Sequence, residues 1–225
     1  MTREPIALSW SGGKDSALAL HALRERPDCE VTALLTSVTS EYDRVSIHGV
    51  RRALLERQVE QLGLPLVVVA LEPRSSNEAY EAAFHRALGE LAAQQPTLTR
   101  IAFGDLYLRE VRDYRDRLLS TTPFTGLYPL WDLPTRDLAE RFIDAGFGAT
   151  LVCTDNTQID PAFAGRAFDH ALLSDLPSTA DPCGGNGEFH TFVHAGPIFR
   201  DPIPVVHGET IVRDERFTYR DLREA

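Results

Sequence analysis

The segment from Ala7 to Leu23, ALSWSGGKDSALALHAL, joins an apolar run to a helical pattern through a break that contains two glycines. The apolar run, 6–10, predicts a buried strand, and the leucines that follow at helical spacing predict a helix over about 16–26. A strand that passes directly into a helix is the unit from which helix-covered sheets are built. Among the segments of the chain, this one gives the strongest indication of an α/β fold.

The break itself, SGGKDS at 11–16, has a direct physical meaning. It directs backbone N–H groups and the N-terminus of a helix at one small volume, an arrangement that stabilises a bound anion such as phosphate. Gly12 and Gly13 permit a tight turn and close approach of the backbone to the ligand, and Ser11 and Ser16 add hydroxyl donors. Neither the P-loop spacing nor the pattern G-x-G-x-x-G is present, and a glycine turn without a ligand is the alternative.

Lys14 is the only lysine of the chain, and the rest of its 23 lysine and arginine residues are arginines. A loop wrapped closely around phosphate has room for a slender stem with a compact charge and not for the wide planar fork of arginine. We expect Lys14 to reach phosphate oxygens from an exposed position, where its removal would leave the fold intact. Asp15 is out of place in a site for anions alone, so we expect it to cap the helix or to hold magnesium beside the phosphates.

The alternation of strand and helix patterns continues through about the first 120 residues. The sequence predicts further strands over 30–38, 66–71 and 100–106, and helices over 49–63, 78–94 and 109–119. These units predict an open, mostly parallel sheet with helices on both faces. The mixed charges of the last helix, REVRDYRDR, are typical of a solvated face.

Prolines and glycines become frequent after about residue 125, and the predicted elements become shorter. We expect a domain boundary there, dividing the chain into 1–125 and a smaller α+β domain, 126–225. The second part predicts helices over 135–145 and 162–173, a strand over 149–155, a strand after the glycine-rich loop 181–188, and an edge strand or hairpin over 209–219.

Composition excludes several classes of protein. The formal net charge of −10 disfavours binding to nucleic acid, because neutralisation of phosphates by basic residues supplies most of that affinity. The three cysteines, an odd number and widely spaced, provide neither a disulfide framework nor a four-cysteine zinc site. No apolar run approaches the ~20 residues of a membrane span, and the N-terminus lacks a basic segment followed by an apolar core. We therefore expect a cytoplasmic protein.

SGGKDS resembles the pyrophosphate-binding loop of the ATP pyrophosphatases, which split ATP between its α and β phosphates. FGDLYLREVRDYRD (103–116), PLW (129–131), LAERFIDAGFGATLV (138–152) and DPCGGNGEFHTFV (181–193) are together similar to the diphthine–ammonia ligase (diphthamide synthetase) family. The resemblance covers most of the chain and implies an adenine nucleotide alpha hydrolase-like (HUP) fold. Gly104-Asp105 followed by YLRE looks closer to the bacterial-type relatives, which would need an acceptor other than diphthine.

The resemblance also implies roles for individual residues. It implies an ATP site made of Ser11, Gly12, Gly13, Lys14, Asp15, Ser16 and Gly104, to which we add Ser9 and Ser37, and it implies that Asp105 and the loop 181–190 line the site. From their chemistry we expect catalytic roles for Lys14, Asp15, Asp105 and Glu188, with Mg²⁺ held by Asp15 and Asp105. From their positions and polar groups we expect substrate binding by His48, Arg51, Gly185, Asn186, Glu188 and His190. Gly185 stands where the family usually has a glutamate, so one acidic contact is missing.

The implied reaction uses ATP and Mg²⁺ to adenylate a carboxylate with release of pyrophosphate, after which ammonia forms an amide. The acceptor, a small molecule or a protein side chain, is not identified by the sequence, and a homodimer is left open. Two alternatives are a tRNA-modifying ATP pyrophosphatase and a non-catalytic sensor of adenine nucleotides. The net charge argues against the first of these.

Some other groups of residues allow a second interpretation. A zinc site at Asp181, Cys183, Glu188 and His190 is disfavoured by the spacing. A persulfide relay between Cys153 and Cys183 is weighed against simple burial of Cys153 as a small apolar residue. His48 and Arg51 fit a solvent-facing role about as well as a ligand contact. Packing is favoured over ligand stacking for Tyr128 and Trp131.

Overall fold

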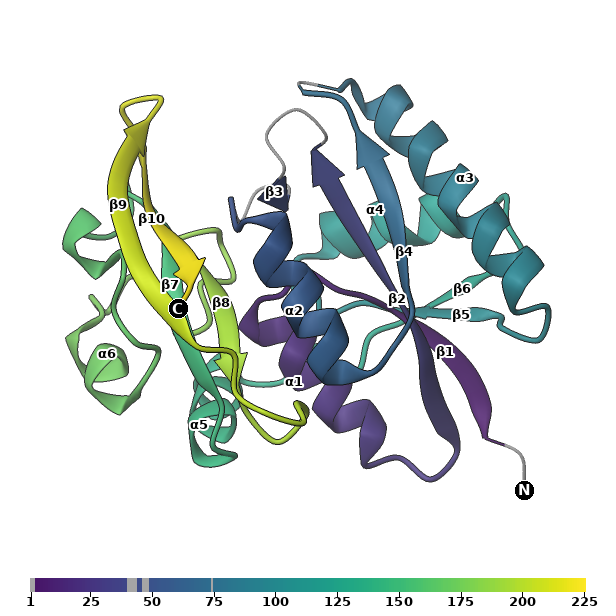
Figure 1. Ribbon diagram of the computed structural model, residues 1–225, viewed down its shortest axis with the longest axis horizontal. Coiled ribbons are helices and arrows are strands. Elements are labelled where there is room, and N and C mark those ends of the chain that lie inside the picture. The colour runs from purple at the N-terminus through teal and green to yellow at the C-terminus, as the bar shows by residue number, and fades with distance from the viewer. Residues whose placement is uncertain (1–2, 40–43, 46–48, 74) are drawn as a thin grey trace.

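The computed structural model describes residues 3–39, 44–45, 49–73 and 75–225, which form two β-sheets with helix α1 packed between them (Figure 1). The first part contains β1 Glu4–Ser9, α1 Lys14–Arg24, β2 Cys29–Thr39, β3 Arg44–Val45, α2 Arg52–Leu62, β4 Leu66–Leu71, α3 Asn77–Gln94, β5 Arg100–Ala102, α4 Arg109–Leu119 and β6 Thr125–Leu127. The second contains α5 Thr135–Asp144, β7 Gly148–Asp155, the 3₁₀ turn η1 Pro161–Phe163, α6 His170–Asp175, β8 Phe189–Ala195, β9 Val205–Arg213 and β10 Phe217–Glu224.

The first sheet is parallel except for the short strand β3. Strand β1 lies in the middle, with β2 and then β4 on one side and β5 and then β6 on the other. The chain thus moves outward from β1 in one direction and then returns to build in the other. The carboxyl ends of β1 and β5 lie at the point where the direction changes, and this is where open parallel sheets bind their ligands.

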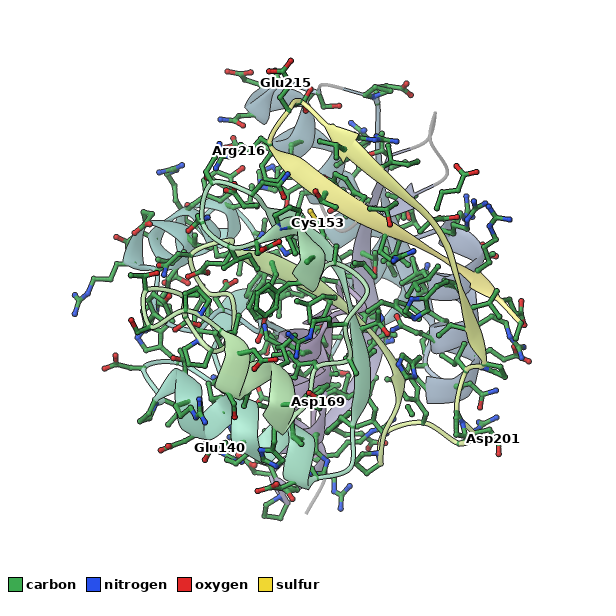
Figure 2. The ribbon with its side chains drawn as sticks, turned by 90° about the vertical axis from the view of Figure 1, so that its left-hand side faces the viewer. Glu140, Cys153, Asp169, Asp201, Glu215 and Arg216 are labelled. Atoms are coloured by element: carbon green, nitrogen blue, oxygen red, sulfur yellow. The ribbon has the colours of Figure 1, made fainter. Side chains whose placement is uncertain are left out.

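The second sheet is antiparallel, in the order β8-β7-β10-β9. Figure 2 faces this side of the molecule and shows Cys153 on β7, with Glu215 and Arg216 at the turn of the β9–β10 hairpin. Strand β8, at the opposite edge of the sheet from β9, lies against α1 and the loop that precedes it. The C-terminal sheet therefore presents one edge strand to the SGGKDS loop.

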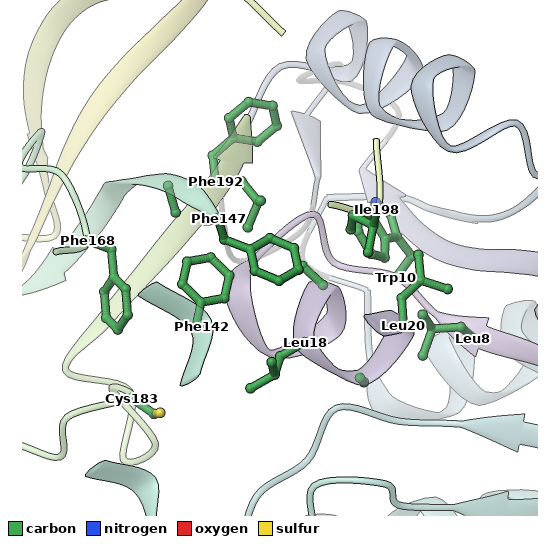
Figure 3. Packing of buried hydrophobic residues seen from close by; sticks show 14 of the residues in the cluster. Leu8, Trp10, Leu18, Leu20, Phe142, Phe147, Phe168, Cys183, Phe192 and Ile198 are labelled. Carbon is green, nitrogen blue, oxygen red and sulfur yellow. The ribbon is translucent and has the colours of Figure 1, made fainter. Parts of the chain in front are cut away.

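The two sheets share one apolar core. Its larger cluster contains buried residues from both parts of the chain, and Figure 3 shows Leu18 of α1 on the side of Phe142 and Phe147, with Leu20 on the side of Leu8 and Trp10. The rings of Phe142 and Phe147 stack with centroids 4.6 Å apart. A smaller cluster fills the other face of the parallel sheet, beneath α3 and α4. Because aromatic and leucine side chains of both parts are buried together, the hydrophobic effect holds the two sheets against each other.

Gln58 of α2 joins three segments inside the molecule. It is completely buried, and its side-chain amide donates hydrogen bonds to the carbonyl oxygens of Gly12 (3.0 Å) and Val193 (2.7 Å). Its own carbonyl oxygen accepts a hydrogen bond from the indole N–H of Trp10 at 3.0 Å. A buried amide with its partners in place fixes the SGGKDS loop against both α2 and strand β8.

The structure confirms the predicted fold class, and it corrects three of the predicted elements. The helix expected over 162–173 is only the turn η1 followed by the six-residue α6. Gly165 has φ +94°, and Ala167 forms a β-bridge with Thr150, so the chain runs extended beside β7 before α6 begins. The strand expected over 100–106 ends at Ala102, and α1 begins two residues earlier than expected.

The division near residue 125 stays a prediction. No helix in the described part of the chain combines the length and the apolar composition of a membrane span.

Replacing Gln58 with leucine should lower the free energy of unfolding by about 3 kcal/mol, because the indole N–H of Trp10 loses its acceptor in the interior and two carbonyl oxygens lose a donor. Urea denaturation measures the change. Gln61→Leu on the same helix is the control, since the side chain of Gln61 accepts a surface hydrogen bond from the backbone N–H of Asp201. That variant should lose about 1 kcal/mol or less. Equal losses in the two variants would contradict the structural role given to Gln58.

Candidate functional site

A cavity of about 460 Å³ opens at the carboxyl ends of β1 and β5. Three segments line it: the SGGKDS loop with the start of α1, the chain from β5 into α4, and the glycine loop before β8 together with the first residues of that strand. The lining residues are Ser9, Ser11, Gly13, Lys14, Asp15, Ser16, Phe103, Gly104, Asp105, Leu106, Tyr107, Leu108, Val111, Arg115, Gly184, Gly185, Asn186, Gly187, Phe189, His190 and Thr191. Segments from both parts of the chain thus form one site.

The SGGKDS loop forms a compact turn that leads into α1. Gly12 has φ +79°, a left-handed conformation that favours glycine. The hydroxyl of Ser16 donates to the carbonyl of Gly13 at 2.9 Å, and the hydroxyl of Ser11 lies 3.2 Å from that of Ser16. These contacts hold the first turn of α1 with its N-terminus toward the cavity, the arrangement that binds anions.

Lys14 is buried, which corrects the expectation of an exposed side chain. Only 4% of it is exposed, and its ammonium donates to both carboxylate oxygens of Asp15 at 2.9 Å. The ammonium also lies 5.5 Å and 5.9 Å from the ring centroids of Phe189 and Phe168. Burial opposes its charge, but the Asp15 carboxylate holds the pKa of Lys14 above its ordinary value. Replacement of this residue therefore affects packing as well as charge.

The C-terminal sheet anchors the backbone of Lys14. Its backbone N–H donates to the hydroxyl of Thr191 on β8 at 3.0 Å, and Val193 of the same strand donates its backbone N–H to the carbonyl of Gly12 at 3.0 Å. Thr191 itself is buried. The conformation of the loop therefore depends on a strand that lies 177 residues further along the chain.

Gly104 lets the segment after β5 lie directly against the start of α1. A Cβ atom at this position would come within 2.9 Å of the carbonyl carbon of Asp15 and 3.0 Å of the backbone nitrogen of Ser16. Both neighbours are backbone atoms, which cannot turn aside as a flexible side chain does. The close approach brings Asp105 beside the SGGKDS loop.

Asp105 faces Arg115 of α4 across the cavity wall. Its Oδ2 lies 3.5 Å from Nε of Arg115, and neither atom has a hydrogen-bond partner among the described residues. Burial raises the pKa of Asp105, and the neighbouring guanidinium opposes that shift. Arg115 also shows that the predicted solvated face of this helix is incomplete, because one of its arginines lines the cavity.

Tyr107 fills the space beside the glycine loop. Its hydroxyl donates to Oδ1 of Asn186 at 3.0 Å, and a Cβ on Gly185 would come within 2.6 Å of that hydroxyl. Burial, followed by the charges of Asp181 and Glu188, raises the pKa of Tyr107 to about 12. The tyrosine therefore remains a hydrogen-bond donor at neutral pH.

Two carboxylates brace the glycine loop from within. Glu188 is 1% exposed and accepts hydrogen bonds from the backbone N–H groups of Asp181 (2.8 Å) and Asn186 (2.9 Å), and from the side-chain amide of Asn186. Asp181 accepts from the backbone N–H groups of Cys183 and Gly185 and from the hydroxyl of Thr135. The glutamate carboxylate thus points into the loop, and Glu188 does not line the cavity.

The structure places the predicted site residues in three groups. Those that line the cavity are Ser9, Ser11, Gly13, Lys14, Asp15, Ser16, Gly104, Asp105, Gly185, Asn186 and His190. Those described elsewhere are Gly12, Ser37, Arg51 and Glu188. Arg51 pairs with Asp221 of β10, its Nη2 lying 2.8 Å from the carboxylate, and so links α2 to the C-terminal sheet. His48 lies outside the described residues. The roles given to all of these residues stay predictions.

Sequence reasoning missed Arg115, Tyr107 and Thr191. All three residues fall within the segments 103–116 and 181–193 that carry the family resemblance, and this was the available signal. The role of Thr191 depends on a contact between distant segments, and no local pattern reveals it.

The cysteines do not favour sulfur chemistry. Burial raises the pKa of Cys153 to about 11 and that of Cys183 to about 12, in the second case against the opposing charge of Lys14. Sulfur nucleophiles react as thiolates, and both groups stay protonated at neutral pH. The thiol of Cys183 donates to the carbonyl of Thr135 at 3.2 Å.

Two family models match the chain, one for each part. Residues 4–122 match the diphthamide synthase N-terminal domain, and residues 134–223 match the diphthamide synthase C-terminal domain. A search of curated proteins found no match.

Gly104→Ala should weaken ATP binding at least about tenfold, because the new methyl group meets the backbone of α1 and forces the two walls of the cavity apart. Calorimetric titration with ATP measures the effect. Gly89→Ala is the matched control, since a Cβ there has nothing within 4 Å. It should leave binding unchanged and stabilise α3 by about 0.5–1 kcal/mol. Unchanged ATP affinity in Gly104→Ala would contradict this role of the glycine.

Proposed function

The chain belongs to the diphthamide synthase family, and from this premise we propose that its cavity binds ATP and Mg²⁺, adenylates a carboxylate and converts the product to an amide with ammonia. The family's domains imply an ATP-using amidating ligase. The finer steps rest on the SGGKDS loop, which directs the start of α1 toward a cavity built by both parts of the chain. The proposal depends on this observation, that the SGGKDS loop meets a cavity lined by both parts of the chain.

In the proposed reaction, a carboxylate oxygen forms a bond to the α phosphorus of ATP. The bond from that phosphorus to the bridging oxygen breaks, and pyrophosphate leaves with the electron pair. Ammonia then attacks the acyl carbon, AMP leaves, and a proton is released as the amide forms. The chain lowers the barrier by positioning the two reactants and by stabilising charge on the departing pyrophosphate.

The SGGKDS loop and the start of α1 would bind the phosphates through backbone N–H groups and the hydroxyls of Ser11 and Ser16. The N-terminal domain, residues 1–125, would supply this site. The C-terminal domain, residues 126–225, would orient the acceptor through Gly185, Asn186 and His190, which line the opposite wall. Ser37 and Arg51 do not line the cavity, and His48 lies outside the described residues, so no role is based on these three. An acceptor other than diphthine fits the bacterial-type motif.

Asp15 and Asp105 fit a magnesium site. Both line the cavity, and Oδ2 of Asp105 is a buried oxygen without a hydrogen-bond partner among the described residues. Magnesium in nucleotide sites is typically held by one or two carboxylates together with phosphate oxygens. The ion would neutralise phosphate charge during displacement at the α phosphorus.

We assign different work to the two other predicted catalytic residues. Lys14 keeps Asp15 oriented, since its ammonium contacts both oxygens of that carboxylate. It also supplies positive charge to the phosphate-binding loop. Glu188 shapes the acceptor wall through three hydrogen bonds within the glycine loop. Both act here as positioning residues.

Lys14→Arg should lower ATP turnover at least about tenfold although the charge is kept, because a wide guanidinium does not fit between Asp15 and the rings of Phe168 and Phe189. Thermal unfolding separates loss of fold from loss of function. Lys14→Met, a side chain of similar length without the charge, separates the effect of charge from the effect of shape. Arg86→Lys, at an exposed position on α3, is the control for an exchange without effect. Normal turnover in Lys14→Arg would contradict the assignment.

The proposed function is tested by incubating the protein with Mg²⁺·ATP, ammonium and a panel of carboxylates, and by identifying the products with ³¹P NMR. AMP and pyrophosphate that appear only with an acceptor support the ligase. ADP and phosphate would contradict it, and binding without turnover across all acceptors would support the sensor. Salt-dependent binding to RNA would favour the tRNA-modifying alternative.

A further inference from the structure

Arg115 and Asp105 form an unfinished contact in the cavity wall. Their facing atoms, Nε and Oδ2, are 3.5 Å apart, and both are buried without a hydrogen-bond partner among the described residues. A buried charged atom that makes no hydrogen bond costs free energy. A ligand with oxygen acceptors could therefore accept the hydrogen bonds that the Arg115 guanidinium does not make to Asp105.

The guanidinium of Arg115 is oriented before any ligand arrives. It lies 4.9 Å from the ring centroid of Phe103, and its Nη1 donates to the hydroxyl of Tyr80 at 3.4 Å. The side chain is still 23% exposed and lines the cavity. A planar fork held in this way loses little freedom when it binds an oxyanion through two parallel hydrogen bonds.

Among the described residues, Lys14 is the other lysine or arginine that lines the cavity, and it is already paired. Its ammonium has short contacts, 2.9 Å, with both oxygens of Asp15 and is almost completely buried. Among the carboxylates of the described residues, Arg115 pairs with Asp105 at the longer distance of 3.5 Å. Arg115 is thus the cavity cation whose charge is less fully paired.

We propose that Arg115 binds the pyrophosphate part of ATP and that Asp105 restrains it while the cavity is empty. This rests on the proposed function and adds to it a phosphate-binding residue from α4. The guanidinium stabilises the electron pair that pyrophosphate takes when the bond to the α phosphorus breaks. Asp105 repels metal-free pyrophosphate and competes with it for Arg115.

The test is calorimetric titration of inorganic pyrophosphate into the full chain without divalent cations. Arg115→Gln should weaken binding at least about tenfold, whereas Asp105→Asn should strengthen it. In the double variant the gain from Asp105→Asn should disappear, because the released arginine is absent. A purely structural ion pair does not produce this opposite pair of effects.

Arg112→Gln is the matched control. Arg112 lies one turn earlier on α4, its guanidinium is 4.7 Å from the ring centroids of both Tyr128 and Trp131, and it does not line the cavity. Its replacement should leave pyrophosphate affinity unchanged. If Arg115→Gln fails to fold in thermal unfolding, Arg115→Lys, which keeps the charge and loses the fork, should bind severalfold more weakly than the wild type.

Wild-type affinity in Arg115→Gln or Arg115→Lys would overturn this inference, as would unchanged or weaker binding in Asp105→Asn. The proposed function would survive either result if the wild type binds ATP and splits it to AMP and pyrophosphate. A folded wild type that binds neither ATP nor pyrophosphate would contradict both proposals.

Discussion

Strand β8 holds the backbone of the SGGKDS loop by two hydrogen bonds, and the rest of the site depends on this contact. Val193 donates to the carbonyl of Gly12, and Thr191 accepts from the backbone N–H of Lys14, each at 3.0 Å. Gln58 reinforces the junction from α2. A glycine-containing turn is intrinsically free to adopt many conformations, so a defined arrangement of its N–H groups needs such external partners. The C-terminal sheet is therefore part of the proposed phosphate site as well as the wall opposite it.

Charge in the cavity is organised as close pairs. Lys14 lies with Asp15 and Arg115 with Asp105, so in the structure each cation has a carboxylate neighbour. A chain with a formal net charge of −10 repels polyanions at long range, and in the proposed site these local cations would attract a nucleotide that has entered. In the proposed function, a nucleotide would compete with these carboxylates for the cations or would bind the carboxylates through a metal ion.

The parts of the structure that follow from local pattern could be predicted from the sequence. The alternation of strands and helices up to α4, the glycine turn before α1 and the position of the cavity at the strand ends all follow from periodicity and from the rules of parallel sheets. The burial of Lys14 and the fixing role of Gln58 could not be predicted, since they arise where segments distant in sequence meet. The sequence around Gly165 has a helical pattern, but Gly165 adopts a positive φ and interrupts the helix.

Hydrogen exchange with and without Mg²⁺·ATP tests most directly whether both parts of the chain form the nucleotide site. The account predicts that ATP slows exchange in the SGGKDS loop and start of α1, in 103–108, and in 184–191, with little change in α3 or the β9–β10 hairpin. Protection restricted to the first part of the chain, or no protection of the SGGKDS loop at saturating ATP, would contradict it.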